Sequence, residues 1–325
     1  MLTSFVHPYS KQSLKTDSGG NLFCEEAKQR DVYRCYGGCY DFLSASPNVG
    51  AARAAYDEHY AHDDAEVLTL SAVTRPWFDA VVPWRKTMLQ NLGSFTGRRV
   101  LLLGNGESYK EFYFLHLGAQ VVFTDLSLVA VRRAKAVFQA SELWLRHRDD
   151  IEFHAVDAMH LPFPDQSFDV IYGSKFVGFL ENVPEFFSEV ARCLKPGGIC
   201  RFADDASSPA WERVRQSLVH PIKARFSKAS RDSLASVRSA SKFGFEQESL
   251  VPLLEQYGFS RLVFIREYFF LRIGQLCLGK LLRWNAAGMR YARPACLALK
   301  WLDDMFAENP WIRRNQLALT WGFDR

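Results

Sequence analysis

Two glycines and two acids each follow or close an apolar run in the first half of the chain. Gly104 and Gly106 follow the apolar run 100–103, Asp125 closes the next such run 21 residues after Gly104, and Asp157 closes a third. In a strand–turn–helix unit the first glycine makes the tight turn and the second lets a ligand approach the backbone. The helix that follows points its N–H groups at that ligand. An acid at the tip of the next strand can accept hydrogen bonds from ribose hydroxyls. The spacing therefore predicts a nucleoside-binding βαβ unit.

The size of Tyr109 argues against a dinucleotide at this turn. A dinucleotide turn has a small residue at its sixth position, where helix meets strand, and Tyr109 occupies that position here. We therefore expect a nucleoside without phosphates, whose charged end is an amino acid held by backbone groups around Gly104, Asn105 and Gly106. Ser108 is small enough to replace a third glycine, and its hydroxyl can cap the helix.

Strand-like and helix-like runs alternate between residues 98 and 205. The strand-like runs are nearly continuous in apolar residues, as a parallel sheet covered on both faces requires. The predicted strands lie at residues 100–104, 120–125, 151–157, 168–173 and 199–204, and the predicted helices at 109–117, 128–148 and 184–194. Later in the chain we expect a helix at 246–257, a strand at 261–270 and a closing strand within the last fifteen residues.

The chain divides into five expected segments. They are a small β-hairpin module at 1–48, a helical cap at 49–95, an α/β core at 96–205, a basic insertion at 206–245, and a completing segment at 246–325. Eight lysines and arginines stand against two acids between residues 206 and 243. The last segment contains a second insertion at 270–310, which is rich in leucine and aromatic residues.

The stretch "VDAMHLPFPDQSFDVIYGSKFVGFLENVPEFFSEVARCLKPGG" adds several ordered motifs behind the glycine turn. It resembles the corresponding stretch of class I S-adenosylmethionine (SAM)-dependent methyltransferases of the ubiquinone/menaquinone-methyltransferase type. The resemblance covers about residues 95–205. It implies a Rossmann-like, seven-stranded, mostly parallel sheet with helices on both faces, SAM as cofactor, and methyl transfer as the activity.

The same resemblance implies a set of cofactor-binding residues. In that family an acid and the residue after it bind the adenine edge, and these positions match Asp157 and Ala158. The full implied set is Tyr60, Gly104, Asn105, Gly106, Asp125, Leu126, Asp157, Ala158, Met159 and Ser174. Besides Ser108, the sequence departs from the family at Gly178-Phe179, where paired histidines are common.

Candidate catalytic residues are few. His59 lies in the helical cap that closes over the cofactor in the family, and His220 lies in the basic insertion, from which a lid residue could reach the acceptor. Lys175 is unusual beside a sulfonium because like charges repel. It is either turned toward the substrate or solvated. His160 is expected to form a wall beside the adenine rather than to act as a base.

The first 48 residues resemble a small zinc-ribbon-like module that accompanies some methyltransferases. The four positions that match its ligands are His7, Ser10, Cys24 and Ala27, of which two cannot serve as ordinary zinc ligands. We therefore expect a module without metal, used for structure or docking. A rearranged site made of His7, Cys24, Cys35 and Cys39 remains an alternative, although Cys35 and Cys39 fall at apolar positions of the module.

The two insertions fall where the family builds its acceptor site. Their basic, apolar and aromatic residues favour a small apolar or aromatic acceptor with an acidic group, in secondary metabolism or in lipid or quinone biosynthesis. Three alternatives stay open. The insertions thicken the core or form a dimer contact, the protein methylates RNA, or it is a non-catalytic partner subunit with this fold. Segment 270–310 is also amphipathic enough for peripheral contact with a membrane.

Composition limits the class of protein further. The net charge of +4 is too small to indicate a nucleic-acid-binding protein by itself. No run approaches the ~18 apolar residues of a membrane span, and the N-terminus has no signal-peptide pattern. Seven scattered cysteines indicate free thiols, and we expect a cytoplasmic protein.

Overall fold

The computed structural model of the protein describes residues 4–25, 31–43, 49–61, 87, 89, 92–106, 109–205, 247–278 and 286–325. Much of the expected helical cap, all of the basic insertion 206–245 and residues 279–285 lie outside this described part.

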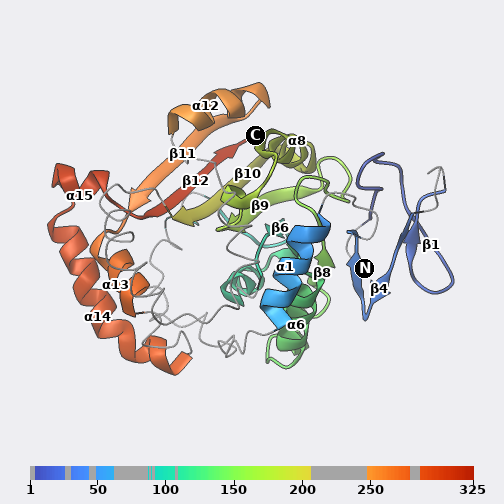
Figure 1. Ribbon diagram of the computed structural model, residues 1–325, viewed down its shortest axis with the longest axis horizontal. Helices are drawn as coiled ribbons and strands as arrows, with labels where there is room; N and C mark the ends of the chain where they lie inside the picture. The colour runs from blue at the N-terminus through green and yellow to red at the C-terminus, as the bar shows by residue number, and fades with distance from the viewer. Residues whose placement is uncertain are drawn as a thin grey trace.

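A nine-stranded sheet forms the centre of the molecule (Figure 1). Its order is β11-β12-β10-β9-β6-β7-β8-β5-β4. The bounds are β4 Cys35–Tyr36, β5 Cys39–Asp41, β6 Arg99–Leu103, β7 Gln120–Asp125, β8 Ile151–Ala155, β9 Phe168–Ser174, β10 Leu194–Asp205, β11 Ser260–Glu267 and β12 Ala318–Asp324. Strands β5 to β10 run parallel to one another, whereas β4 is antiparallel to β5, and β12 is antiparallel to both β10 and β11.

The order of the strands places a binding crevice beside β6. The chain winds outward from β6 through β7 to β8, then returns to the other side of β6 with β9. Such a reversal leaves a crevice outside the carboxyl ends of the strands, because the connections on its two sides diverge. Gly104, Asp125 and Asp157 follow or end β6, β7 and β8, so all three lie at this edge.

The sheet has two strands more than the seven expected, because the N-terminal module adds a hairpin to its edge. Strand β5 runs parallel to β8 with Cys39 opposite Phe153, and Phe42 N donates to Ala155 O at 3.0 Å. His154 Nδ1 also accepts a hydrogen bond from Tyr40 N at 3.2 Å. Without the hairpin β8 would expose a row of unpaired backbone groups. The rest of the module forms a separate sheet of β1 Lys15–Thr16, β2 Leu22–Phe23 and β3 Val32–Tyr33.

Helices cover both faces of the central sheet. They are α1 Gly50–Ala61, η1 Tyr109–Phe112, α5 Tyr113–His116, α6 Leu128–Gln139, α7 Trp144–His147, η2 Val177–Phe179, α8 Val183–Cys193 and α12 Gln247–Gln256. One core joins α8 to the sheet through Phe186, Phe187 and Trp321, and a second joins η1 and α6 to it through Phe112 and Phe138. All five of these aromatic side chains are fully buried. The two cores confirm the expectation of a sheet buried on both faces.

Three C-terminal helices lie at the end of the molecule opposite β1 (Figure 1). They are α13 Phe270–Leu278, α14 Ala286–Met305 and α15 Pro310–Arg314. Buried Asp303 of α14 accepts backbone hydrogen bonds from Phe269, Phe270 and Leu271 at 2.7–3.0 Å. Because these N–H groups belong to the first turn of α13 and the residue before it, the carboxylate caps that helix and fixes it against α14.

Several expected boundaries are wrong, and β10 begins at Leu194 rather than at residue 199. The helix expected at 128–148 ends at Gln139, and the short helix α7 follows after Ser141 bonds back to Phe138 O. The strand expected at 261–270 stops at Glu267, because α13 begins at Phe270. Within the described part, no helix is long and apolar enough to cross a membrane.

Candidate active site

A cavity of about 310 Å³ opens at the carboxyl ends of β6 to β9, beside α1. This volume lies at the lower end of the range typical of small-molecule sites. The residues that line it are Val49, Ala51, Ala52, Tyr56, Tyr60, Leu103, Gly104, Thr124, Asp125, Leu126, Val156, Asp157, Ala158, Met159, Lys175, Phe176, Phe179, Leu180 and Glu181.

The glycine turn is tightly enclosed from two sides. Gly104 and Gly106 have φ of +61° and +52°, in the left-handed region that favours glycine. A Cβ at Gly104 would lie 2.5 Å from the Phe176 side chain, and one at Gly106 would lie 2.1 Å from the Tyr60 hydroxyl. Neither glycine could be replaced without moving an aromatic ring, so the turn offers bare backbone to a ligand.

Asp125 is held by backbone donors on both carboxylate oxygens. Gly106 N donates to Oδ2 at 2.6 Å, and Ser127 N donates to Oδ1 at 2.8 Å. Burial raises the pKa of Asp125 to about 6, although these backbone hydrogen bonds act in the opposite direction. The glycine turn and the acid are thus joined into one rigid unit.

Asp157 faces the same cavity from the loop after β8. Its Oδ1 accepts a hydrogen bond from Met159 N at 2.9 Å, and its Oδ2 lies 3.1 Å from His160 Nδ1. Asp157 is 6% exposed and lines the cavity, and each of its carboxylate oxygens has further lone pairs that could accept a hydrogen bond from a ligand.

Helix α1 is fastened over the cavity by side chains of its outer turns. Asp57 Oδ1 accepts hydrogen bonds from Ser127 Oγ at 2.5 Å and from Val129 N at 3.3 Å, and Arg133 donates to Tyr60 O. Arg53 pairs with Asp41 of β5 at 2.8 Å. These bonds place Tyr60 above the glycine turn.

Most of the predicted cofactor residues come together at this cavity. Tyr60, Gly104, Asp125, Leu126, Asp157, Ala158 and Met159 line it, as does the predicted catalytic Lys175. Asn105 and Gly106 lie in the turn behind the wall, and Ser174 is the last residue of β9, next to Lys175.

His59 is not among the residues that line the cavity, but its ring lies 5.0 Å from the Tyr60 ring, centroid to centroid, and its catalytic role stays a prediction. Tyr56 and Tyr60 are four residues apart and share the inner face of α1, whereas His59 is turned about 100° away from Tyr60. The other predicted catalytic histidine, His220, lies outside the described residues.

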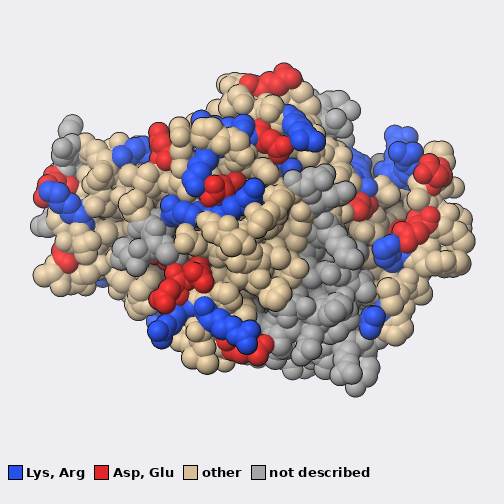
Figure 2. Space-filling view, turned by 180° about the vertical axis from the view of Figure 1, so that it is seen from behind, with Lys and Arg blue, Asp and Glu red and all other residues tan. Residues whose placement is uncertain are grey.

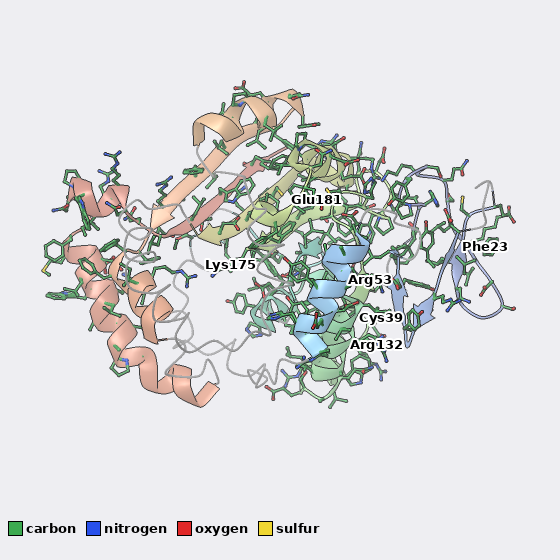
Figure 3. The ribbon with its side chains drawn as sticks, viewed as in Figure 1. Phe23, Cys39, Arg53, Arg132, Lys175 and Glu181 are labelled. Carbon is green, nitrogen blue, oxygen red and sulfur yellow. The ribbon has the colours of Figure 1, made fainter. Side chains whose placement is uncertain are left out.

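Sequence reasoning missed the aromatic wall beyond β9. Phe176, Phe179, Leu180 and Glu181 line the cavity next to Lys175. The sequence indicates these residues only through their position, directly after a predicted strand that ends at the crevice. Lys175 itself has φ of +59°, and its N–H donates to Ala203 O at 2.8 Å. Such a backbone conformation is strained for a lysine and is often found at functional sites. Figure 3 shows Lys175 at the carboxyl end of the central strands.

The zinc-ribbon-like positions are joined by hydrogen bonds. His7 Nε2 lies 2.9 Å from Asp31 Oδ2 and its Nδ1 accepts a hydrogen bond from Ser10 N at 3.0 Å, while Cys24 Sγ donates to Gln12 at 3.3 Å. Among the described residues, no three His, Cys, Asp or Glu side chains are grouped as a metal site would require. His7, Cys24, Cys35 and Cys39 do not form such a group, and the expectation that the module holds no metal stays a prediction.

Comparison with known proteins gives the family. A family model for a methyltransferase domain (Methyltransf_11) matches residues 101–202. The ubiquinone/menaquinone biosynthesis C-methyltransferase of Paracoccus denitrificans is 31% identical over 191 residues, covering 55% of this chain and 72% of the relative. A demethylmenaquinone methyltransferase of Renibacterium salmoninarum is 27% identical over 182 residues, covering 54% and 73%.

A solved structure agrees with these relatives in fold. Geranyl diphosphate C-methyltransferase from Streptomyces coelicolor A3(2) matches with a TM-score of 0.53 at 12% identity, over 86% of this chain and 99% of that one. The chain belongs to the class I SAM-dependent methyltransferases of the ubiquinone/menaquinone-methyltransferase type. It is a SAM-dependent methyltransferase, and its cofactor is S-adenosylmethionine.

The residues at the cavity fit that cofactor. Glycine at 104 and 106 leaves backbone accessible, and both polar atoms of the Asn105 side chain are buried with no hydrogen-bond partner among the described residues. Buried polar groups without partners are rare in folded proteins, and they mark a place where a ligand supplies the missing bonds. An amino-acid group near this turn would supply both a donor and an acceptor.

Proposed function

We propose that the cavity binds SAM in one orientation, set by the glycine turn and two acids. The backbone of 104–106 and the Asn105 amide would hold the methionine part, Asp125 the ribose hydroxyls and Asp157 the adenine edge. The observation that carries this proposal is that Asp125 and Asp157 line a single cavity of about 310 Å³ together with Gly104 of the glycine turn. A carboxylate accepts hydrogen bonds from hydroxyl and amino groups, which suits both assignments.

The acceptor is proposed to be a small apolar or aromatic molecule with an acidic group. Phe176, Phe179 and Leu180 supply apolar wall next to the ammonium group of Lys175. The relatives named above carry the name of demethylmenaquinone or ubiquinone/menaquinone methyltransferases, so a quinone-like acceptor is the first to test. Lipid and secondary-metabolite acceptors that combine an apolar or aromatic part with an acidic group would suit the same residues.

Bound SAM supplies an electrophilic methyl group on a sulfonium. The protein's own part is to align the acceptor with that methyl, to exclude water and to orient the acidic group. Phe176 and Tyr60 pack against the turn from opposite sides and exclude water there, while Lys175 attracts the anionic group of the acceptor. Because the Lys175 cation would be repelled by a sulfonium beside it, an anion between the two cations would stabilise both.

The matched pair Lys175→Met and Glu181→Gln tests the acceptor proposal, because both residues line the cavity with opposite charges. With an acidic acceptor, K175M should raise its KM about tenfold while leaving the Kd for SAM nearly unchanged. E181Q should leave KM unchanged or lower it. An acceptor of known turnover whose KM is unaffected by K175M would refute the role of Lys175.

We further propose that α14 and α15 contact a membrane surface that contains such an acceptor. Leu297, Trp301 and Met305 repeat every four residues on the exposed face of α14, and Trp311 of α15 is also exposed. Trp side chains favour the boundary between lipid and water. The nearby exposed cations are Arg293, Arg313 and Arg314.

Sedimentation with phospholipid vesicles, with and without anionic lipid, tests this contact. We expect the double variant Trp301→Ala/Trp311→Ala to lose most of the bound fraction. Leu145→Ala is the matched control, because Leu145 is 82% exposed on α7 and outside this surface. Equal binding by both variants would refute the contact.

On the face seen in Figure 2, the cations and acids of the described residues are interspersed, which gives no support to a broad nucleic-acid surface.

A further inference from the structure

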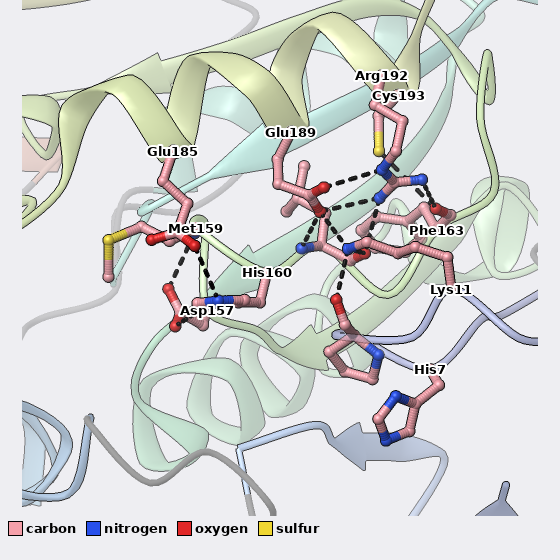
Figure 4. A network of polar contacts seen from close by, with 12 residues as sticks. His7, Lys11, Asp157, Met159, His160, Phe163, Glu185, Glu189, Arg192 and Cys193 are labelled. Carbon is pink, nitrogen blue, oxygen red and sulfur yellow. Dashed lines mark hydrogen bonds and ion pairs between the residues drawn. The ribbon is translucent and has the colours of Figure 1, made fainter. Parts of the chain in front are cut away.

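His160 lies between two carboxylates that come from different elements. Its Nδ1 lies 3.1 Å from Asp157 Oδ2, and its Nε2 lies 3.2 Å from Glu185 Oε1 of α8 (Figure 4). A neutral imidazole has one N–H donor and one bare nitrogen, so it can satisfy only one of these acceptors. An arrangement with a carboxylate at each nitrogen requires the imidazolium, in which both nitrogens donate.

The N-terminal module supplies the surface against which this ring rests. The Tyr9 ring lies 4.4 Å from the His160 ring, centroid to centroid, at an interplanar angle of 44°. An aromatic face next to a cation stabilises its charge. His160 is thus enclosed by the module, α8 and the loop that contains Asp157.

The module is held in place beside His160 by a buried ion-pair network. Lys11 Nζ lies 2.6 Å from Glu189 Oε2 of α8, and Arg192 also binds Glu189, with its Nε 2.9 Å from Oε1 (Figure 4). Val6 N donates to Pro162 O at 3.0 Å, two residues from His160. Tyr9 lies in sequence between Val6 and Lys11, so these two contacts hold its backbone beside His160.

We infer that the N-terminal module positions the Asp157 carboxylate for the adenine of SAM through Tyr9 and protonated His160, and that loss of this proton weakens SAM binding. The inference rests on the proposed function of Asp157. His160 is a positioning residue in this scheme, because it acts on the cofactor through Asp157. The module then contributes to cofactor affinity without touching the cofactor and without a metal ion.

The charged groups around His160 agree with this assignment. The hydrogen bond to Asp157 is the largest cause that raises the pKa of His160, and the charges of Asp157 and Glu185 act in the same direction. Partial burial and Lys11 of the module oppose them. The other titratable groups of the module on this side are the Tyr9 phenol and His7, whose ring lies 6.0 Å from Tyr9. The bound proton is lost as pH rises through the raised pKa, so affinity should fall on the alkaline side.

The experiment is calorimetric titration of S-adenosylhomocysteine into the full chain between pH 6 and pH 9. For the unaltered protein the Kd should rise about tenfold across this range, since a charge-assisted hydrogen bond on Asp157 is lost. His160→Gln should bind weakly at every pH and should show no fall in affinity on the alkaline side. Glu185→Gln should move the midpoint of the profile to lower pH, because one of the two carboxylates is removed.

Two comparisons separate this role from a merely structural one. Tyr9→Phe retains the ring and should keep the profile, whereas Tyr9→Leu should move the midpoint to lower pH. His147→Gln is the matched control, because His147 Nδ1 lies 3.1 Å from Asp150 in the same three-residue spacing, outside the cavity. It should leave the profile unchanged.

The outcomes distinguish failure of the inference from failure of the proposed function. If the unaltered protein binds the ligand and H160Q keeps the same pH dependence, the inference is overturned while the proposed site stands. If Y9L keeps the midpoint of the unaltered protein, the part played by the module is overturned. If the unaltered protein binds no S-adenosylhomocysteine at any pH, the proposed site itself is wrong.

Discussion

Replacing Asp125 by Asn tests whether the acid at the end of β7 binds the cofactor as a carboxylate. Its pKa is raised from 3.8 to about 6, chiefly by burial. At that pKa about nine tenths of the carboxyls are ionised at pH 7 and about one tenth at pH 5. If only the carboxylate binds the ribose, SAM affinity should fall about tenfold from pH 7 to pH 5. In Asp125→Asn the affinity should be lower at pH 7 and should show no acid-side fall.

The same shift has a consequence for stability, with a definite sign. Because the pKa is higher in the folded protein, the folded state binds more protons between pH 3.8 and about 6, so stability falls as pH rises through that window. The pKa of Asp125 differs by about 2.2 between the folded and the unfolded state (about 6 minus 3.8), which corresponds to a loss of ~3 kcal/mol in the free energy of unfolding at pH 7. Asp125→Asn removes this loss, but asparagine has only one carbonyl oxygen, so it can no longer accept from both Gly106 N and Ser127 N. The net gain at pH 7 should therefore be only ~1 kcal/mol.

Calorimetric titration with S-adenosylhomocysteine at pH 5, 6, 7 and 8 measures the affinity, and urea unfolding without ligand measures the stability. Glu267→Gln is the control, because burial also raises the pKa of Glu267, on edge strand β11 and outside the cavity lining. It should alter stability without changing the affinity profile. Equal affinity of the unaltered protein at pH 5 and pH 7, or an acid-side fall that persists in Asp125→Asn, would refute the reasoning.

Further variants test the turn, the sheet and the anchor of the N-terminal module. Gly106→Ala should weaken SAM binding at least about tenfold, because its Cβ would lie 2.1 Å from the Tyr60 hydroxyl. Calorimetric titration measures this affinity, and an unchanged Kd would contradict the close contact between Tyr60 and the glycine turn. Gly322→Ala should lower the free energy of unfolding by about 3 kcal/mol in urea, because its Cβ would meet the Cys200 carbonyl oxygen at 2.1 Å between β10 and β12. Glu189→Gln should cost about 2 kcal/mol in the same assay, since it leaves two partly buried cations without their shared carboxylate. Treatment with EDTA should leave the melting temperature unchanged, and a clear decrease would indicate a structural metal in the module.

The α/β core and the two acids could be predicted because their signals are local. A continuous apolar run followed by Gly104 and Gly106 specifies a buried strand and a tight turn, whatever surrounds them. The acids that end the next two strands necessarily meet at the same sheet edge, because carboxyl ends of parallel strands lie together. The fold and most of the proposed cofactor residues follow from these short-range rules.

The tertiary structure decided what depends on contacts between distant segments. Nothing near residues 39–41 indicates that this strand pairs with β8, because edge pairing is a property of the closed sheet. His59 and Tyr60 are adjacent in sequence, yet only Tyr60 faces the cavity, since one residue along a helix turns the side chain by about 100°. The enclosure of His160 by Tyr9, Asp157 and Glu185 likewise joins three segments. Spacing along the chain determines which backbone forms locally, whereas the charges and rings that surround a side chain are fixed only when separate elements pack together.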